Sequence, residues 1–178
     1  MVKLLSSVDC NEIDENETFF VDTNVLCAVH FHTSSWSNNK VNAYSSFLSS
    51  LLLKNITLYV SSLSLQEFYH LIEKTERKIY EANNGSISKK DFRRNKVERA
   101  RIANELQLIH KQIAGQYTLI DDVIDVDDVC NFVNQYTSHA YDPVDFAIVN
   151  HHASNCSNFI TDDSDFKLDS NITVYSYT

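Results

Sequence analysis

The side chains of this 178-residue chain that are best suited to chemistry are carboxylates that follow short apolar runs. Four separate segments each carry one such acid. The acids are Asp22, Glu67, Asp145 and Asp163, with Asp165 two residues beyond the last. Carboxylate oxygens without histidine suit hard cations such as Mg²⁺ or Mn²⁺, which activate water and stabilise the charge that develops during attack on a phosphodiester. These residues predict a metal-assisted hydrolytic site, provided that the fold brings them together.

Each acid also has a purely structural explanation when it is taken alone. Asp22 and Asp142 stand where a helix N-cap is expected, and Pro143 suits the first position of a helix. Glu67 ends the sequence Ser-Leu-Gln-Glu, which has the S-x-x-E pattern of a capping box. Capping alone does not explain why four segments carry an acid at the same point, so the hydrolytic interpretation is favoured.

The elements that must position these acids alternate along the chain. Runs rich in β-branched and aromatic residues predict strands, and the stretches between them have helical periodicity. We expect strands at 18–21, 56–60, 117–120, 158–161 and 172–175, and helices at 24–31, 41–53, 63–82, 89–114, 126–135 and 143–154. This order is typical of an α/β fold with a central parallel sheet of about five strands. Because right-handed crossovers place every loop after a strand at one edge of the sheet, the acids should meet there.

The composition excludes several classes of enzyme. The chain has two glycines, Gly85 and Gly115, so the glycine-rich loops of dinucleotide-binding enzymes, P-loop NTPases and ordinary α/β-hydrolases are absent. A single proline also argues against a turn-rich β-sandwich. At about 150 residues per domain, the length predicts one domain spanning residues 1–178.

Taken together, four motifs resemble those of PIN-domain ribonucleases, and most closely those of VapC-type toxins of bacterial toxin–antitoxin pairs. They are Val-Asp-Thr-Asn-Val-Leu at 21–26, Ser-Leu-Gln-Glu-Phe at 64–68, Asp-Phe-Ala-Ile-Val at 145–149 followed by Ala153, and Thr-Asp-Asp-Ser-Asp-Phe at 161–166. They occur in the family's order, so the combination is far more specific than any one motif. The resemblance implies a PIN-like three-layer α/β/α fold.

The resemblance also implies roles for individual residues. The catalytic and metal-binding acids would be Asp22, Glu67, Asp145 and Asp163, with Asp165 as an additional metal ligand. Asn24 and Thr161 would be polar residues that orient the acids, whereas Asp162 occupies a position that varies in the family. The implied activity is Mg²⁺- or Mn²⁺-dependent hydrolysis of RNA by an activated water. The implied partners are RNA, a cognate antitoxin and a second copy of the chain in a homodimer.

One segment, at about 73–114, is longer than a minimal PIN domain needs. The turn Asn-Asn-Gly-Ser at 83–86 predicts that it forms a helical hairpin arm. Residues 89–101 carry seven basic and two acidic side chains, a net charge of +5, although the whole chain has a net charge of −9. The basic residues are Lys89, Lys90, Arg93, Arg94, Lys96, Arg99 and Arg101. They either form a solvated face with charge pairs or guide RNA or an antitoxin toward the acids.

Other acids and the cysteines match no functional motif. Five aspartates follow the run 117–120, and we expect them to cap the next helix and to add surface charge: Asp121, Asp122, Asp125, Asp127 and Asp128. The four cysteines show no paired spacing, and no stretch has the pattern of a signal peptide or a membrane span. We therefore expect reduced thiols and a cytoplasmic protein without a membrane partner.

Two other functions remain open at the level of sequence. A PIN-like module can bind RNA or protein without cutting, although all four expected acids are present here. A haloacid-dehalogenase-like phosphatase would use Asp22 as its nucleophile. That family requires a second aspartate two residues later, and this chain has Asn24 there.

Overall fold

The computed structural model describes residues 1–31, 36–122, 125–138 and 140–178. Its strands are β1 (Val2–Leu4), β2 (Thr18–Val21), β3 (Thr57–Ser61), β4 (Thr118–Ile120), β5 (Asn158–Ile160) and β6 (Thr173–Ser176). Its helices are α1 (Thr23–His30), α2 (Asn38–Leu53), α3 (Ser62–Asn84), α4 (Lys89–Arg94), α5 (Lys96–Gln116), α6 (Val126–Gln135) and α7 (Pro143–His152), with 3₁₀ turns at Leu5–Ser7, Cys10–Glu12 and Phe166–Leu168.

The strands form one parallel sheet in the order β1-β6-β5-β2-β3-β4. The central strand β2 pairs with β5 through Val21 and Ile160 and with β3 through Phe20 and Tyr59. Phe19, Phe20 and Val21 are almost completely buried, as expected for a parallel strand that is covered on both faces. The carboxyl ends of β2, β3 and β5 therefore meet at one edge of the sheet, which is the edge where the sequence predicts the site.

The five predicted strands are confirmed, but the prediction of about five strands omits β1. This edge strand pairs with β6, and all three of its residues are exposed. Because it buries no side chain, it lacks the alternating or continuous apolar pattern by which strands are found in a sequence.

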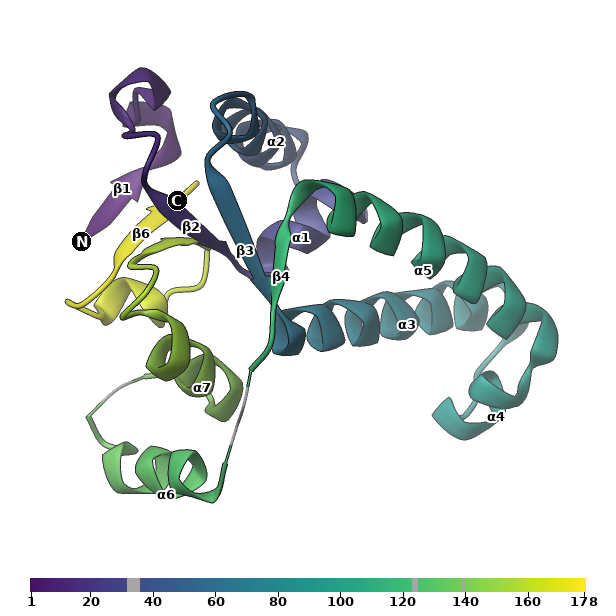
Figure 1. Ribbon diagram of the computed structural model, residues 1–178. Helices are drawn as coiled ribbons and strands as arrows, with labels where there is room; N and C mark the ends of the chain where they lie inside the picture. The colour runs from purple at the N-terminus through teal and green to yellow at the C-terminus, as the bar shows by residue number, and fades with distance from the viewer. Residues whose placement is uncertain (32–35, 123–124, 139) are drawn as a thin grey trace.

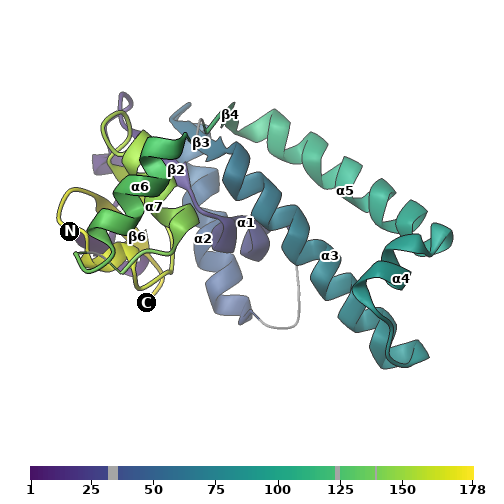
Figure 2. The same ribbon diagram turned by 90° about the horizontal axis from the view of Figure 1, so that it is seen from below.

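Helices cover both faces of the sheet. Neighbouring residues of β2 point to opposite faces, so Phe19 packs in one core and Phe20 in the other. The first core includes buried residues of α1, α2, α3 and α5, and the second includes buried residues of α7 and the segment 156–174. Figures 1 and 2 show α6 and α7 on one side and the longer helices on the other. The structure thus has three layers.

The predicted helical hairpin arm is confirmed, with one correction. Helices α3 and α5 extend away from the sheet, and the chain reverses between them (Figure 1). Gly85 ends α3 with a φ of 88°, a left-handed conformation that glycine adopts without strain. The single helix predicted at 89–114 is wrong, because Asn95 separates α4 from α5. The Asn95 side chain accepts hydrogen bonds from the N–H groups of Val97 (3.1 Å) and Glu98 (3.3 Å), which starts a new helix.

Two further expectations concern cysteines and membranes. The four cysteines are free thiols. Within the described ranges, no helix is both long enough and apolar enough to span a bilayer.

Candidate active site

Asp22 is placed by the central strand. It follows β2 directly, is only 5% exposed, and its backbone N–H donates to the carbonyl of Ile160 (3.1 Å). As predicted, it is also an N-cap, since its carboxylate accepts from the N–H of Thr23 at 2.6 Å. The hydroxyl of Thr161 donates to the other carboxylate oxygen at 2.6 Å, and the side-chain amide of Asn24 donates to the same oxygen. The carboxylate therefore has little freedom to rotate.

Glu67 comes from the second turn of α3. The structural explanation for this residue, a capping box with Ser64, is wrong, because the helix begins earlier than that pattern suggests. The N-cap is Ser61, whose hydroxyl accepts from the N–H of Ser64 at 3.1 Å. Glu67 is exposed and faces the same cleft as Asp22.

Asp145 is placed by the start of α7. Asp142 caps this helix, as predicted, by accepting from the N–H groups of Val144 (2.7 Å) and Asp145 (3.0 Å). Pro143 fills the first helical position, where its missing N–H costs nothing. Both aspartates line the cleft. The sequence identifies Asp142 only as a cap, so its place among the site acids is a new finding.

Asp163 is connected to Asp22 through Thr161. The N–H of Asp163 donates to the Thr161 hydroxyl oxygen at 3.0 Å, and the Asn24 amide donates to that oxygen at 3.0 Å. Thr161 is fully buried. The structure therefore brings Asn24 and Thr161 into contact with the acids that the resemblance assigns them to orient.

A single cleft of about 330 Å³ collects these groups. It is lined by Asp22, Thr23, Asn24, Cys27, Phe31, Trp36, Glu67, Leu71, Thr75, Asp142, Asp145 and Asp163. Four separate segments thus deliver their acids to one place. Among the described residues that line the cleft, none is a lysine or an arginine. The negative charge of the acids is not neutralised by the cleft itself.

The electrostatics of the cleft reflect this excess of acid. The pKa of Asp22 is raised to about 7, mainly by burial; the hydrogen bond from Thr161 opposes this shift and the charge of Glu67 adds to it. Burial likewise raises the pKa of Asp145 to about 8, and the charges of Asp22 and Asp142 add to the effect. In the folded protein the charged forms of these two carboxyls are therefore disfavoured. A bound cation would stabilise the charged forms and lower both pKa values.

The donor chemistry fits a hard divalent cation, since the lining acids offer oxygen and no imidazole. As the side chains stand, no three His, Cys, Asp or Glu residues of the described ranges are gathered closely enough to enclose an ion. A hard cation such as Mg²⁺ keeps several water ligands and needs only one or two carboxylates from the protein, so the acids of the cleft suffice to hold it.

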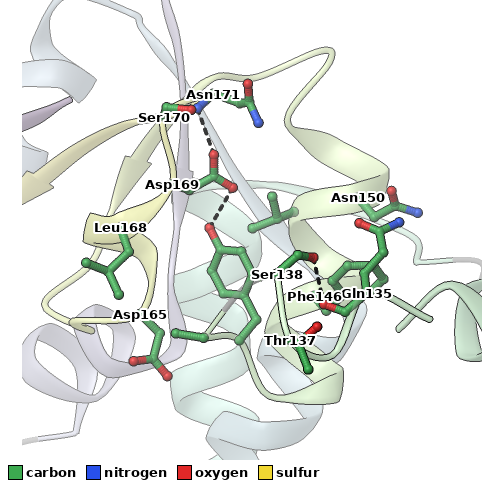
Figure 3. A pocket seen from close by; sticks show the side chains of 13 residues that line it. Gln135, Thr137, Ser138, Phe146, Asn150, Asp165, Leu168, Asp169, Ser170 and Asn171 are labelled. Carbon is green, nitrogen blue, oxygen red and sulfur yellow. Dashed lines mark hydrogen bonds between the residues drawn. The ribbon is translucent and has the colours of Figure 1, made fainter. Parts of the chain in front are cut away.

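Asp165 lies apart from the other predicted ligands. Its backbone N–H donates to a carboxylate oxygen of Asp163 at 2.9 Å, but its side chain lines a second pocket of about 540 Å³. Figure 3 shows Asp165 at this pocket, together with Asp169, which accepts a hydrogen bond from Tyr141 at 2.9 Å. The structure thus groups four of the five predicted metal ligands in one cleft and places the fifth beside it.

Asp162, which the resemblance leaves outside the core set, has a separate role. It forms an ion pair with Lys40 and accepts from the hydroxyls of Tyr44 and Ser176, each at 2.8 Å. It therefore joins α2 to the C-terminal strand.

The aspartates after β4 correct one expectation. Asp125 and Asp128 form a capping box for α6, as predicted. Asp122 does not add surface charge, because its side chain is completely buried. One carboxylate oxygen accepts from the N–H of Leu63 (2.8 Å) and the other lies 2.6 Å from Nε2 of His152. Asp122 thus connects the start of α3, which carries Glu67, to the end of α7, which carries Asp145.

The basic residues of the arm are largely occupied in ion pairs. Arg93 contacts Glu73 of α3 at 2.7 Å, and Arg101 contacts Glu76 of α3 as well as Glu98 at 3.1 Å. Arg94 and Arg99 make longer pairs of 3.8 and 3.9 Å with acids of the arm. The three lysines, Lys89, Lys90 and Lys96, are exposed and have no ion-pair partner within the described ranges. None of the seven lines the acidic cleft.

The chain is similar in structure to a solved protein. No family model matches the chain, and no curated protein is significantly similar to it. Among solved structures, it is similar to a chain of VapBC2 from Rickettsia felis bound to a DNA fragment from their promoter. The TM-score is 0.55 with 18% identity, over 90% of this chain and 99% of the other.

The architecture defined by the sheet, its two helical layers and the position of the cleft is a PIN-like α/β fold. The likeness to the VapBC2 chain confirms this fold class, which the sequence predicts. At 18% identity, the likeness is evidence for the fold alone.

Proposed function

We propose that this protein is a metal-dependent endoribonuclease and the toxin of a toxin–antitoxin pair. The observation that carries the proposal is the convergence of Asp22, Glu67, Asp145 and Asp163, from four separate segments, on one cleft without a lining lysine or arginine. The structural likeness to a chain of VapBC2 supports a partner antitoxin. The proposal also includes a homodimer, a cytoplasmic location and a single domain, as the resemblance and composition imply.

The chain's own residues would hold the cation and position the substrate. A bound Mg²⁺ or Mn²⁺ supplies the Lewis acidity that activates water and offsets the charge developing on the phosphate. The pKa of Asp22 is raised to about 7 and that of Asp145 to about 8 in the cation-free protein, and a bound cation would favour the charged form of both carboxyls. Thr161 and Asn24 keep the Asp22 carboxylate oriented throughout. Because they are ligands, the acids are poor general bases, so their role is coordination.

The test is cleavage of labelled single-stranded RNA by the purified protein with Mg²⁺, Mn²⁺ or EDTA. We expect cleavage that requires the cation and is lost in Asp22→Asn and in Asp145→Asn. Asp127→Asn is the matched control, because Asp127 is an exposed acid of α6 outside the cleft. Metal-independent RNA binding without any cleavage would contradict the proposal and favour a silent PIN-like module.

A phosphomonoester included in the same assay tests the phosphatase alternative. That reaction needs an acid two residues after the nucleophile, and the structure has Asn24 there, with its amide donating to Asp22. We therefore expect no phosphomonoester hydrolysis. Release of phosphate that is lost in Asp22→Asn, without RNA cleavage, would favour the phosphatase.

A further inference from the structure

The lining of the cleft combines two chemically different sets of side chains. Besides the acids, it includes the uncharged side chains of Cys27, Phe31, Trp36, Leu71 and Thr75. Glu67, Leu71 and Thr75 recur every four residues along α3, so they lie on one face of the helix. This face of α3 therefore places two uncharged side chains in line with one of the acids. An uncharged, partly aromatic wall suits a flat, apolar group better than a phosphate.

Trp36 is the largest aromatic group of that wall, and it is held in place. The ammonium of Lys40 lies 3.9 Å from the centre of the indole, in a cation–π contact. Lys40 is itself anchored by its ion pair with Asp162, whose other carboxylate oxygen binds the hydroxyls of Tyr44 and Ser176. The indole therefore presents a preorganised surface to the cleft, and its position is tied to the residue next to Asp163.

We propose that Trp36 is a substrate-binding residue on which a base of single-stranded RNA stacks while the adjoining phosphate lies at the acids. The inference deepens the proposed ribonuclease function and rests on it for the identity of the substrate. Stacking on an aromatic ring tolerates every base, because each base has a π-face. Trp36 therefore selects for unpaired bases rather than for sequence, and a base within a duplex is not available to it.

The chain offers a direct probe, because Trp36 is its one tryptophan. Its fluorescence reports on the cleft alone. We would titrate the Asp145→Asn protein, which is not expected to cleave, with a short single-stranded RNA in millimolar Mg²⁺, and in parallel with the same strand in a duplex. The expected result is saturable quenching by the single strand and none by the duplex. Unchanged emission with the single strand would overturn the inference.

Substitutions give a second measurement in the same background. Trp36→Ala should raise the dissociation constant for labelled single-stranded RNA by about 5- to 150-fold, the equivalent of one stacked base. Trp36→Phe should retain most of the affinity, since phenylalanine also stacks. Tyr136→Ala is the control, because Tyr136 is an exposed aromatic residue of α6 that does not line the cleft. Equal affinities for all three variants would contradict the inference.

Cleavage kinetics separate this inference from the function on which it rests. In the active protein, Trp36→Ala should raise KM with little change in kcat. RNA cleavage with an unaltered KM in Trp36→Ala would refute the role of Trp36 and leave the ribonuclease intact. Saturable quenching without any cleavage by the wild type would support RNA stacking at Trp36 and refute the ribonuclease. The quenching titration needs no substitution at Trp36, so it remains decisive even if the alanine variant does not fold.

Discussion

Replacing Asp22 by Asn should stabilise the cation-free protein, although Asp22 is central to the proposed activity. The carboxyl is 5% exposed, and burial raises its pKa to about 7, with a further contribution from the charge of Glu67. An amide has nearly the same shape, can still accept the capping hydrogen bond from the N–H of Thr23, and carries no charge to desolvate. The substitution therefore removes a cost of folding while it removes a metal ligand.

The magnitude follows from the linkage between pKa and stability. A carboxyl whose pKa is raised on folding has its full stability below the unfolded pKa and loses stability as pH rises to the folded pKa. For Asp22 the shift from 3.8 to about 7 corresponds to about 4 kcal/mol at pH values above 7. The amide NH₂ cannot accept from Thr161 and Asn24, which costs about 2 kcal/mol. The net gain should be about 2 kcal/mol, or roughly 4–8 °C in Tm for a domain of this size.

Thermal unfolding in EDTA measures this effect. The stability of Asp22→Asn relative to wild type should increase by about 3 kcal/mol between about pH 5 and about pH 8, because only the wild type must ionise Asp22. Asp127→Asn, at an exposed site, should show no such change. An Asp22→Asn protein that is less stable than wild type by the same amount at every pH would refute the reasoning, because the carboxylate would then be a net stabilising group.

Three other predictions follow from the same structure. Mn²⁺ should raise the Tm of the wild type more at about pH 8 than at about pH 6, because the cation and protons compete for Asp22 and Asp145. The Tm of Asp22→Asn should change little. An equal shift of Tm in both proteins would show that the ion binds elsewhere. Asp122→Ala should lower the free energy of unfolding in urea by about 2–4 kcal/mol, more than Asp122→Asn, because alanine leaves the partly buried N–H of Leu63 without its acceptor. Equal stability of the two variants would show that an acceptor oxygen at this position does not stabilise the fold. Arg101→Ala should destabilise the protein by about 1–2 kcal/mol, because it leaves the buried Glu76 unpaired. The affinity for RNA should not change. Weaker RNA binding at unchanged stability would instead indicate that Arg101 contacts a phosphate.

The acids of the cleft are predictable from the sequence because local geometry places them. A residue that directly follows a parallel strand lies at one edge of the sheet whatever the rest of the chain does. Asp22 occupies such a position, Asp163 lies three residues after the end of β5, and the Asp-Pro start of α7 identifies Asp145. Glu67 is predicted through the resemblance, although its local pattern suggests a capping box that the structure does not contain.

Other features depend on contacts between distant parts of the chain. Asp122 binds Ser62, sixty positions away, and His152, thirty positions away, so no local pattern distinguishes it from an ordinary cap. Trp36 lines the cleft together with residues of α1 and α3, which contact each other, and the sequence around it carries no periodic signal. The break at Asn95 is a different case. Asn95 is a favoured N-cap, but charged residues on both sides continue the helical pattern and conceal it.

Dependence of RNA cleavage on Mn²⁺ concentration tests most directly whether the acidic cleft is a nuclease site. The Mn²⁺ concentration that gives half-maximal cleavage of single-stranded RNA should match the one that gives half-maximal binding by calorimetry, since the same carboxylates serve both. Asp145→Asn should lose both signals, and Asp127→Asn should keep both. Cleavage that persists in EDTA, or that is unchanged in Asp145→Asn, would show that the chemistry does not occur at these acids.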